Sequence, residues 1–319
     1  MMASIRLIHL PTGAELPLEQ APSCVIALGN FDGVHTAHRM LLAAAVRLSK
    51  QKADCHSAVF FFDPPSSQVL FTGTRLLSTL PEKLAIFAEA GIEYAYLADF
   101  SSLRNMPADP FIEEVLLDIC HADKVVCGFN FRFGQGGKGN VTLLEQRLGT
   151  QNVRTLPPCC MPIPGHRAEH VISSTAVRNA LACGDVRAAR LLLGRPYRFS
   201  APVLHGKQLG RQLGIPTINQ NPPLGKVLPT NGVYITQVTI GNEKVFGISN
   251  VGIHPTVDDK AEQNCETHLL NFEGDLYGQA ITVEFLEMLR QEQKFDSVEQ
   301  LQKTILGDIE KAKQYFGIE

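Results

Sequence analysis

Two histidines stand three residues apart where an apolar run meets an alanine-rich segment. The stretch reads GNFDGVHTAH, and the histidines are His35 and His38. The amino end of a helix favours an anion, because its backbone N–H groups are unsatisfied and its dipole is positive there. Histidines at that end suit the stabilisation of phosphate charge during phosphoryl or nucleotidyl transfer. The H-x-x-H spacing alone fits equally well a helix entry with incidental histidines.

A second group of residues suited to phosphate lies in HGKQLGRQLGIPTIN. Glycines let backbone amides approach a phosphate, and cations between them neutralise its charge. Thr217 and Asn219 then alternate on one face of an extended segment, and their oxygens suit Mg²⁺. A polar turn region is the alternative. The residues predicted to bind ATP here are Gly206, Lys207, Gly210, Arg211 and Gly214.

A candidate base lies in the stretch CETHLLNF. If this stretch is a strand, Glu266, His268 and Leu270 share one face. A carboxylate within reach of a primary alcohol can take its proton as the oxygen attacks phosphorus. The alternative is a half-exposed strand glutamate with no catalytic part.

The first half of the chain alternates strand and helix signals. Repeated strand-helix-strand order with continuous apolar strands predicts a parallel sheet covered on both faces. The expected helix in STLPEKLAIFAEAG has Thr79 and Glu82 at capping-box spacing, Pro81 in its first turn and Gly91 at its end. The expected strands are CVIAL, SAVFFF, YAYLADF and KVVCGF, and the other expected helices cover residues 38–49 and 110–120.

The pattern of strand and helix signals changes towards the second half of the sequence. Residues 151–171 are expected to be a proline-rich interruption, followed by two short helices in SSTAVRNALACG and DVRAARLLLG. Beyond Pro196, strand-like runs separated by Gly, Asn and Asp predict an antiparallel barrel. A last helix is expected from Ser297, with Gln300 completing a cap. One face of that helix carries Leu301, Ile305, Ile309 and Phe316.

Composition narrows the class of protein. The 319 residues include 45% hydrophobic and 19% charged residues, so two globular domains are expected. The net charge of −3 disfavours a protein that coats nucleic acid. Apolar runs are far shorter than the roughly 20 residues of a membrane span, and the first residues make a poor signal peptide. Eight cysteines without C-x-x-C or metal-ligand spacing indicate a reduced, cytoplasmic protein. Oligomeric state is not readable.

Longer motifs in the sequence resemble those of a known family. GNFDGVHTAH resembles the signature of bacterial bifunctional riboflavin kinases/FAD synthetases, and its H-x-x-H element resembles that of the wider nucleotidylyltransferase superfamily. The resemblance implies an α/β plus all-β protein. A Rossmann-like nucleotidylyltransferase domain would span residues 1–184, and an antiparallel β-barrel kinase domain with a C-terminal helix would span 185–319. Further matching stretches are LSTLPEKLAIFAEAGIEY, VCGFNFRFGQGGKGNVTLL, VISSTAVRNALACGDVRAARLLLGRPY, LPTNGVY, ISNVGIHPTV and GDLYG.

The resemblance also implies roles for single residues. In the first domain, His35 and His38 would contact the ATP phosphates. Thr217 and Asn219 would bind Mg²⁺ and phosphate, and Glu266 would be the kinase base. Arg290 would lie near the flavin, although a surface ion pair is the alternative. Other residues implied in ATP or flavin binding by the first domain are Gly29, Asn30, Phe31, Asp32, Asn130, Ser174 and Arg178.

Two departures from the family pattern fall in the first domain. Ala37 replaces the glycine between the histidines, and FFDPPS stands where the family has TFEPHP, which puts Phe61 and Pro65 at the threonine and histidine. The leading hypothesis is an enzyme that makes FMN from riboflavin and ATP, then FAD and pyrophosphate from FMN and ATP. The alternatives are a kinase with a degenerate first domain and a non-catalytic flavin- or nucleotide-binding regulator.

Overall fold

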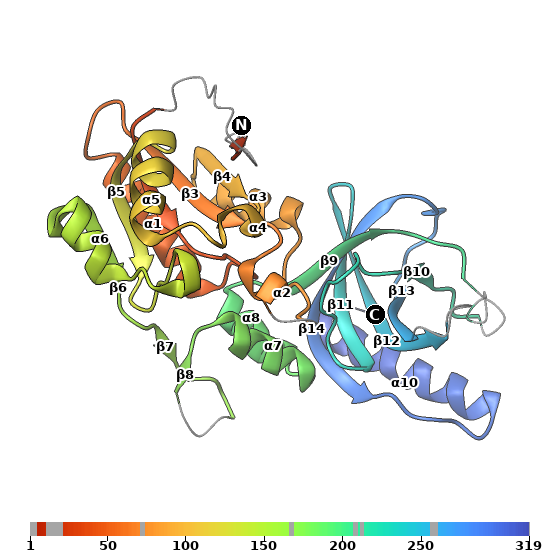
Figure 1. Ribbon diagram of the computed structural model, residues 1–319. Helices are drawn as coiled ribbons and strands as arrows, with labels where there is room; N and C mark the ends of the chain where they lie inside the picture. The colour runs from red at the N-terminus through yellow and green to blue at the C-terminus, as the bar shows by residue number, and fades with distance from the viewer. Residues whose placement is uncertain are drawn as a thin grey trace. The chain divides into compact units, whose positions relative to one another are not determined.

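The computed structural model describes residues 5–10, 22–70, 74–165, 169–206, 210, 214–255 and 261–318. The chain divides into two compact units (Figure 1). One unit comprises residues 1–162 and 167–174, and the other comprises residues 163–166 and 175–319.

The first unit is built on a parallel sheet. Its strand order is β1-β4-β3-β2-β5-β6, and each neighbouring pair runs parallel. The register sets Ala27 of β2 opposite Val59 of β3 on one side and Val126 of β5 on the other. The strands are β1 (Arg6–His9), β2 (Cys24–Leu28), β3 (His56–Phe62), β4 (Tyr94–Ala98), β5 (Ala122–Gly128) and β6 (Val153–Leu156).

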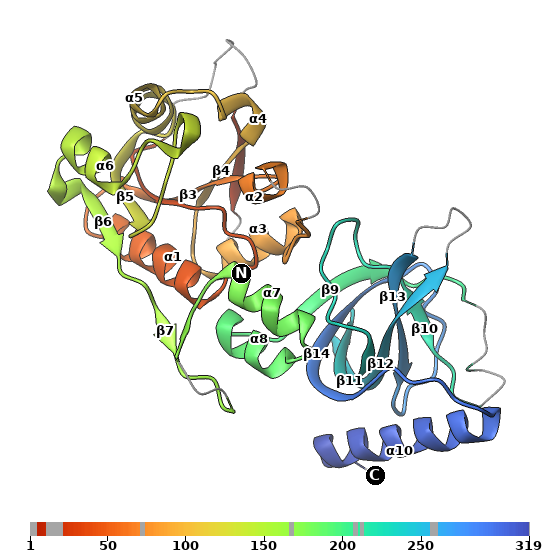
Figure 2. The same cartoon turned by 60° about the horizontal axis from the view of Figure 1, so that its bottom comes forward.

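Helices cover both faces of this sheet, as the alternation of strands and helices predicts (Figures 1 and 2). Helices α1 (Thr36–Ser49) and α3 (Leu80–Glu89) pack on one face, where α1 buries Leu41 and Leu42. On the other face, a π-helix at Phe111–Ile119 packs beside α6. The remaining bounds are α2 (Ser66–Leu70), α4 (Phe100–Leu103), α5 (Ala108–Pro110) and α6 (Val141–Leu148).

The chain changes direction at the middle of the sheet. From β2 it proceeds through β3 to β4 on one side, then returns to β5 beside β2 and continues to β6. In open α/β sheets, ligands bind beyond the carboxyl ends of the strands at such a switch point. The segments after Leu28 and Gly128 therefore meet at the edge of the sheet where a ligand is expected.

Local signals placed α3 correctly. Thr79 accepts from the backbone of Glu82, the carboxylate of Glu82 accepts from Thr79 N at 2.8 Å, and Pro81 lies in the first turn. The expected interruption at 151–171 is wrong in part, because it contains β6 and a small antiparallel pair, β7 (Cys160–Met161) with β8 (His170–Val171). The short run VRTL before two prolines gives too weak a strand signal to be recognised.

The second unit is built on an antiparallel sheet. Its order is β10-β13-β12-β11-β14-β9, and the two edges meet where Leu204 N donates to Asn219 O at 2.8 Å. This bears out the expected antiparallel β domain. The strands are β9 (Tyr197–Pro202), β10 (Ile218–Gln220), β11 (Gly232–Ile240), β12 (Glu243–Pro255), β13 (Ala261–Leu269) and β14 (Ala280–Gln291).

The two faces of this sheet have different partners. One face encloses a buried row of hydroxyls, in which Ser249 Oγ lies 2.8 Å from Thr236 Oγ1 and 2.7 Å from Thr267 Oγ1. The other face packs on α10 (Val298–Phe316), whose Ile309 lies in one apolar cluster with Ile248. The cap of α10 is Ser297, as expected, and α7 (Ser174–Ala182) and α8 (Val186–Leu193) precede the sheet.

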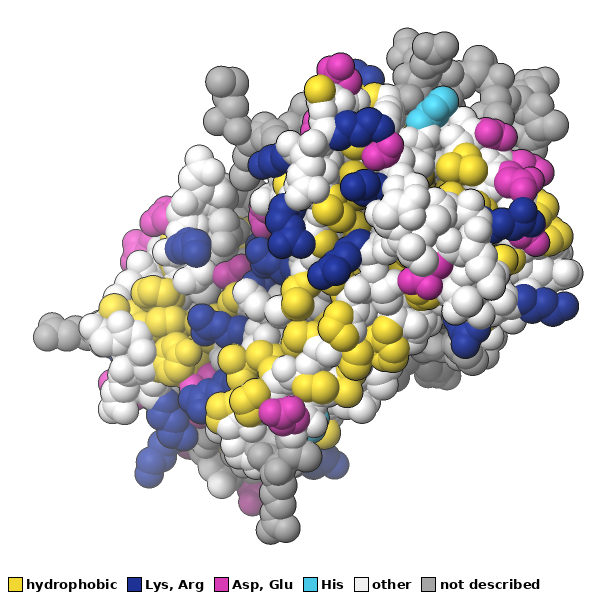
Figure 3. All heavy atoms as spheres, turned by 90° about the vertical axis from the view of Figure 1, so that its left-hand side faces the viewer, with side chains coloured by type: hydrophobic (Ala, Val, Ile, Leu, Met, Phe, Trp, Pro, Cys, Tyr) yellow, Lys and Arg dark blue, Asp and Glu magenta, His cyan; other side chains and the backbone are white. Residues whose placement is uncertain are grey.

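Surface charges are of mixed sign on the face that Figure 3 shows, where basic and acidic side chains lie interspersed. No helix among the described residues is long and apolar enough to cross a membrane. The described cysteines are unbridged, and burial raises the pKa of the Cys127 thiol to about 11.

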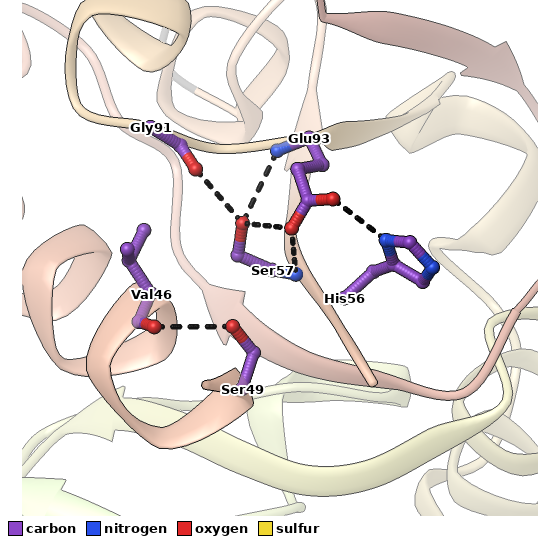
Figure 4. A network of polar contacts seen from close by, with 6 residues as sticks. All are labelled: Val46, Ser49, His56, Ser57, Gly91 and Glu93. Atoms are coloured by element: carbon purple, nitrogen blue, oxygen red, sulfur yellow. Dashed lines mark hydrogen bonds and ion pairs between the residues drawn. The ribbon is translucent and has the colours of Figure 1, made fainter. Parts of the chain in front are cut away.

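A polar network ties β3 to the turn before β4 (Figure 4). His56 Nδ1 lies 2.6 Å from Glu93 Oε2, and Ser57 Oγ donates to Gly91 O at 2.9 Å. Partial burial acts to raise the pKa of Glu93, but hydrogen bonds from His56 and Ser57 outweigh it, so the pKa lies below its usual value of 4.5.

The depressed pKa of Glu93 predicts a pH dependence of stability. A carboxyl whose folded pKa is lowered contributes stability above its unfolded pKa and loses it as the pH falls through the folded pKa. We expect Glu93→Gln to destabilise the protein at pH 7 and to flatten the decline of stability below about pH 4.5. Urea unfolding at several pH values measures this. An unchanged pH profile would contradict a role for the Glu93 carboxylate.

Candidate active sites

The histidine turn, residues 29–38, connects β2 to α1 at the switch point. The turn is tightly wound, since Gly33 has φ +78° and the buried residues Phe31 and Val34 have φ 49° and 39°. Backbone strain of this kind persists only where surrounding contacts enforce it, and it is common at ligand-binding turns.

Asp32 holds the histidine turn in place. Its buried carboxylate accepts from Leu77 N at 2.9 Å and from Ser78 N at 3.2 Å. Ser78 Oγ in turn accepts from Gly33 N at 2.9 Å. These contacts brace the turn against the start of α3, so Asp32 acts through the backbone of the turn.

His35 and His38 lie together, as the spacing predicts. Their rings stack with centroids 3.7 Å apart, and His35 Nδ1 caps α1 by accepting from His38 N at 3.3 Å. Burial, and secondarily the neighbouring His35, hold the pKa of His38 well below its usual 6.5, so His38 is neutral at pH 7. His38 Nδ1 is buried and has no hydrogen-bond partner among the described residues.

The other residues of the turn have distinct contacts. Asn30 Oδ1 accepts from Ser66 Oγ of α2 at 2.9 Å. The ring of Phe31 is buried, and its centroid lies 5.0 Å from that of His38. A Cβ on Gly29 would lie 3.1 Å from Cε2 of this Phe31 ring. Phe31 therefore packs against the ring of His38.

Asn130 lies on the second segment of the switch point, just after β5. It is exposed, and the bend before it is closed by Phe131 N donating to Gly128 O at 3.0 Å. Phe129, next to Asn130, is 51% exposed. Phenylalanine is usually buried, and the sequence did not predict this exposure.

Ser174 and Arg178 lie on α7. Ser174 Oγ donates to Asp32 O at 2.8 Å, and both residues belong to the first compact unit. Arg178 is half-buried and belongs to the second compact unit.

The altered stretch FFDPPS has structural partners of its own. Phe61 is fully buried, with its ring centroid 5.3 Å from that of Phe87. Asp63 Oδ1 accepts from the buried Lys83 Nζ at 3.0 Å. The stretch is therefore anchored at Asp63 to α3, and through Ser66 to Asn30.

Ala37 lies in the first turn of α1, where the backbone is helical. Its φ is not among the positive values of the chain, so the position does not require glycine. We expect Ala37→Gly to lower the free energy of unfolding by up to about 1 kcal/mol, because glycine is a poor helix former. We expect FAD synthesis to be unchanged. Chemical unfolding and a rate assay with FMN measure the two effects, and a clear gain in FAD synthesis would show that the methyl group hinders the nucleotide.

In the second unit, two glycines lie against the pair predicted to bind metal. A Cβ on Gly206 would collide with the Asn219 side chain. A Cβ on Gly210 would collide with Ile215 O and lie 3.4 Å from Thr217 Oγ1. Gly214 has φ +74°. Lys207 and Arg211 lie outside the described residues.

Glu266 stands between two amides on one face of the sheet. It is paired across the antiparallel ladder with Asn219 of β10 and with Asn250 of β12. Directly opposed residues have Cβ atoms about 5 Å apart on the same face. The expectation that Glu266 and His268 share a strand face is confirmed, and His268 Nδ1 lies 2.8 Å from Pro216 O, next to Thr217.

Oxygen donors therefore gather around Glu266. The hydroxyl of Thr217, the amide of Asn219 and the carboxylate of Glu266 are oxygen donors of the kind that suit a hard divalent cation, which also keeps substrate and water ligands. Gly206 and Gly210 pack so closely against Asn219 and Ile215 O that neither position has room for a side chain. No group of three or more His, Cys, Asp or Glu suited to metal occurs among the described residues.

Arg290 takes part in an ion pair. Its Nε lies 2.7 Å from Oδ2 of Asp308 on α10, which is buried, and its guanidinium lies 5.6 Å from the ring centroid of Phe295. The register places it opposite Val233, the cross-strand partner of Asn250. It thus lies on the face that carries Glu266.

Sequence reasoning missed Asn250 and Asn264 as residues of this face. They stand in ISNVG and QNCETH, and alternation from Glu266 would have placed Asn264 on the same face. The neighbourhood of Asn250 depends on cross-strand register, which the sequence does not reveal.

Two family models match separate parts of the chain. The model for FAD synthetase matches residues 18–175, and the model for riboflavin kinase matches residues 193–316. The two matches define a class of transferase in which an FAD synthetase domain precedes a riboflavin kinase domain.

Relatives match over almost the whole chain. The chain is 36% identical to the bifunctional riboflavin kinase/FMN adenylyltransferase of Escherichia coli K12, covering 94% of this chain and 96% of that protein. It is 30% identical to the Bacillus subtilis enzyme of the same name, covering 98% of each. The chain belongs to the family of bifunctional riboflavin kinases/FMN adenylyltransferases. A crystal structure of a Streptococcus pneumoniae protein described as a macrolide-efflux protein also matches, with TM-score 0.83, 27% identity, and 97% and 99% coverage.

Proposed function

We propose that the chain makes FAD from riboflavin in two ATP-dependent steps, with the kinase site around Glu266 and the adenylyltransferase site at the histidine turn. Residues 185–319 phosphorylate riboflavin to FMN, and residues 1–184, a Rossmann-like domain, adenylylate FMN and release pyrophosphate. The placement of Glu266 directly between Asn219 and Asn250 is the observation that carries the kinase site.

In the kinase step, the Glu266 carboxylate takes the proton of the riboflavin 5′-hydroxyl as that oxygen attacks the γ-phosphorus of ATP. Thr217 and Asn219 would hold Mg²⁺, which would neutralise phosphate charge. Gly206 and Gly210, which lie against Asn219 and Ile215 without side chains of their own, let backbone amides approach the phosphates. The protein thereby positions the alcohol and the phosphate in line.

In the adenylyltransferase step, an FMN phosphate oxygen attacks the α-phosphorus of a second ATP. His35 and His38, at the start of α1, stabilise the charge that develops there. Asp32 and Phe31 fix the turn that presents them. Asn130, Ser174 and Arg178 complete the binding of nucleotide and flavin. We place both reactions in the cytoplasm, where ATP and Mg²⁺ are available.

A single incubation tests both activities. Purified protein is mixed with riboflavin, ATP and Mg²⁺, and the flavins are separated chromatographically. Accumulation of FAD by way of FMN is expected. FMN alone would reject the adenylyltransferase half, and the absence of any turnover would reject both. A parallel incubation with FMN in place of riboflavin measures the second step independently.

A further inference from the structure

A serine and an asparagine meet at the carboxyl edge of the first sheet. Asn30 follows β2, and Ser66 begins α2 shortly after β3, the strand that pairs in parallel with β2. Because neighbouring parallel strands end at the same edge, both side chains lie where a ligand of this sheet is expected. Ser66 Oγ donates to Asn30 Oδ1 at 2.9 Å, and both residues are half-buried.

This hydrogen bond decides which way the Asn30 amide points. An asparagine side chain carries an acceptor oxygen and two N–H donors on opposite sides of one carbon. The hydroxyl that donates to Oδ1 therefore turns Nδ2 away from itself. Asn30 Nδ2 makes no hydrogen bond within the described part of the chain, and it is not one of the buried polar atoms without a partner there. Its two N–H groups are open to a ligand, and such donors suit an anion.

The position of Ser66 is set by the segment before it. Asp63 Oδ1 accepts from Nζ of the buried Lys83 at 3.0 Å, which anchors the segment to α3. Pro65 is buried directly before Ser66. The hydroxyl is thus presented by a braced segment, and a group that is already in place loses little freedom when a ligand binds.

The contact sets this chain apart from the family pattern. TFEPHP, the pattern that FFDPPS replaces, has a histidine at position 65 and a proline at position 66. A proline has no hydroxyl that could orient Asn30, and Pro65 has no ring nitrogen to offer an anion. The chain therefore lacks a polar side chain at one position and has a hydroxyl at the next.

We propose that Ser66 orients the Asn30 amide so that its N–H groups bind a phosphate oxygen of ATP or FMN in the adenylyltransferase reaction. The proposal rests on the adenylyltransferase function proposed above. Asn30 touches the substrate, and Ser66 is a positioning residue that acts through Asn30. The pair supplies the polar contact that Pro65 cannot make.

The test is a double-mutant cycle on FAD synthesis from supplied FMN, with the KM for ATP and the KM for FMN measured separately. We expect Ser66→Ala to raise one of the two values about 3- to 10-fold with kcat little changed, since one ordinary hydrogen bond is lost. Asn30→Ala should raise the same value further. Adding Ser66→Ala to Asn30→Ala should then have no effect, because Ser66 acts through the amide. The value that rises identifies the phosphate, and a rise in neither overturns the proposal.

Two conservative variants separate orientation from folding. Ser66→Thr keeps the hydroxyl and should restore KM. Asn30→Asp still accepts from Ser66 but replaces the N–H donors with an oxygen that repels phosphate, so its KM should exceed that of Asn30→Ala. Equilibrium dialysis of ATP and of FMN gives Kd without turnover, and Kd should follow KM. Ser101→Ala, exposed on α4, is the matched control and should change nothing.

Two outcomes would overturn the role of Ser66. Additive losses in the cycle would show that Ser66 acts independently of Asn30, and an Asn30→Asp variant with wild-type KM would show that the N–H groups bind no phosphate. If the wild-type protein makes no FAD from FMN, the adenylyltransferase function itself fails, which is a different result.

Discussion

Replacing Glu266 with glutamine abolishes FMN formation and leaves FAD synthesis from supplied FMN intact. Loss of a general base costs typically 10²- to 10⁴-fold in rate. Glutamine keeps the size and the hydrogen-bonding capacity between Asn219 and Asn250, so the sheet remains paired. The rate of FMN formation, followed chromatographically, measures the effect.

The control for Glu266→Gln is Glu243→Gln. Glu243 begins β12 on the same sheet and is exposed, so its replacement should change neither reaction. If FMN formation by Glu266→Gln continues near the wild-type rate, another group takes the proton and the assignment is wrong. If FAD synthesis from FMN falls as well, the variant disturbs more than the kinase site.

Local signals in the sequence predicted much of the fold. The helix α3 was recognisable because Thr79, Pro81 and Glu82 act within one turn, where spacing alone fixes the contacts. The edge strands β1 and β6 were not recognised, because four half-exposed residues carry little periodicity.

In the candidate sites, too, local contacts were predictable from the sequence and contacts between distant segments were not. The pairing of His35 with His38 followed from their spacing on one helix start. The support that Asp32 draws from Ser78, and the amides beside Glu266, depend on contacts between distant segments. Such contacts are decided by sheet register and loop path, which a single sequence does not specify.

Replacing His38 with leucine tests the histidine turn with little risk to the fold. Leucine has a similar volume and can pack against Phe31, whose ring centroid lies 5.0 Å from that of His38. His38 Nδ1 is buried without a partner among the described residues, so its removal leaves no donor or acceptor unmet there. We therefore expect the melting temperature to stay the same or to rise.

FAD synthesis by His38→Leu should fall about 10²- to 10³-fold, the usual cost of losing a group that stabilises transition-state charge. FMN formation should be unchanged, because the kinase residues lie on another sheet. The exposed His9, at the end of β1, gives the control variant His9→Leu. A polar atom that costs stability and is still kept indicates a function for His38, since packing alone favours leucine. A lower melting temperature with full FAD synthesis would reverse that conclusion and make His38 a structural residue.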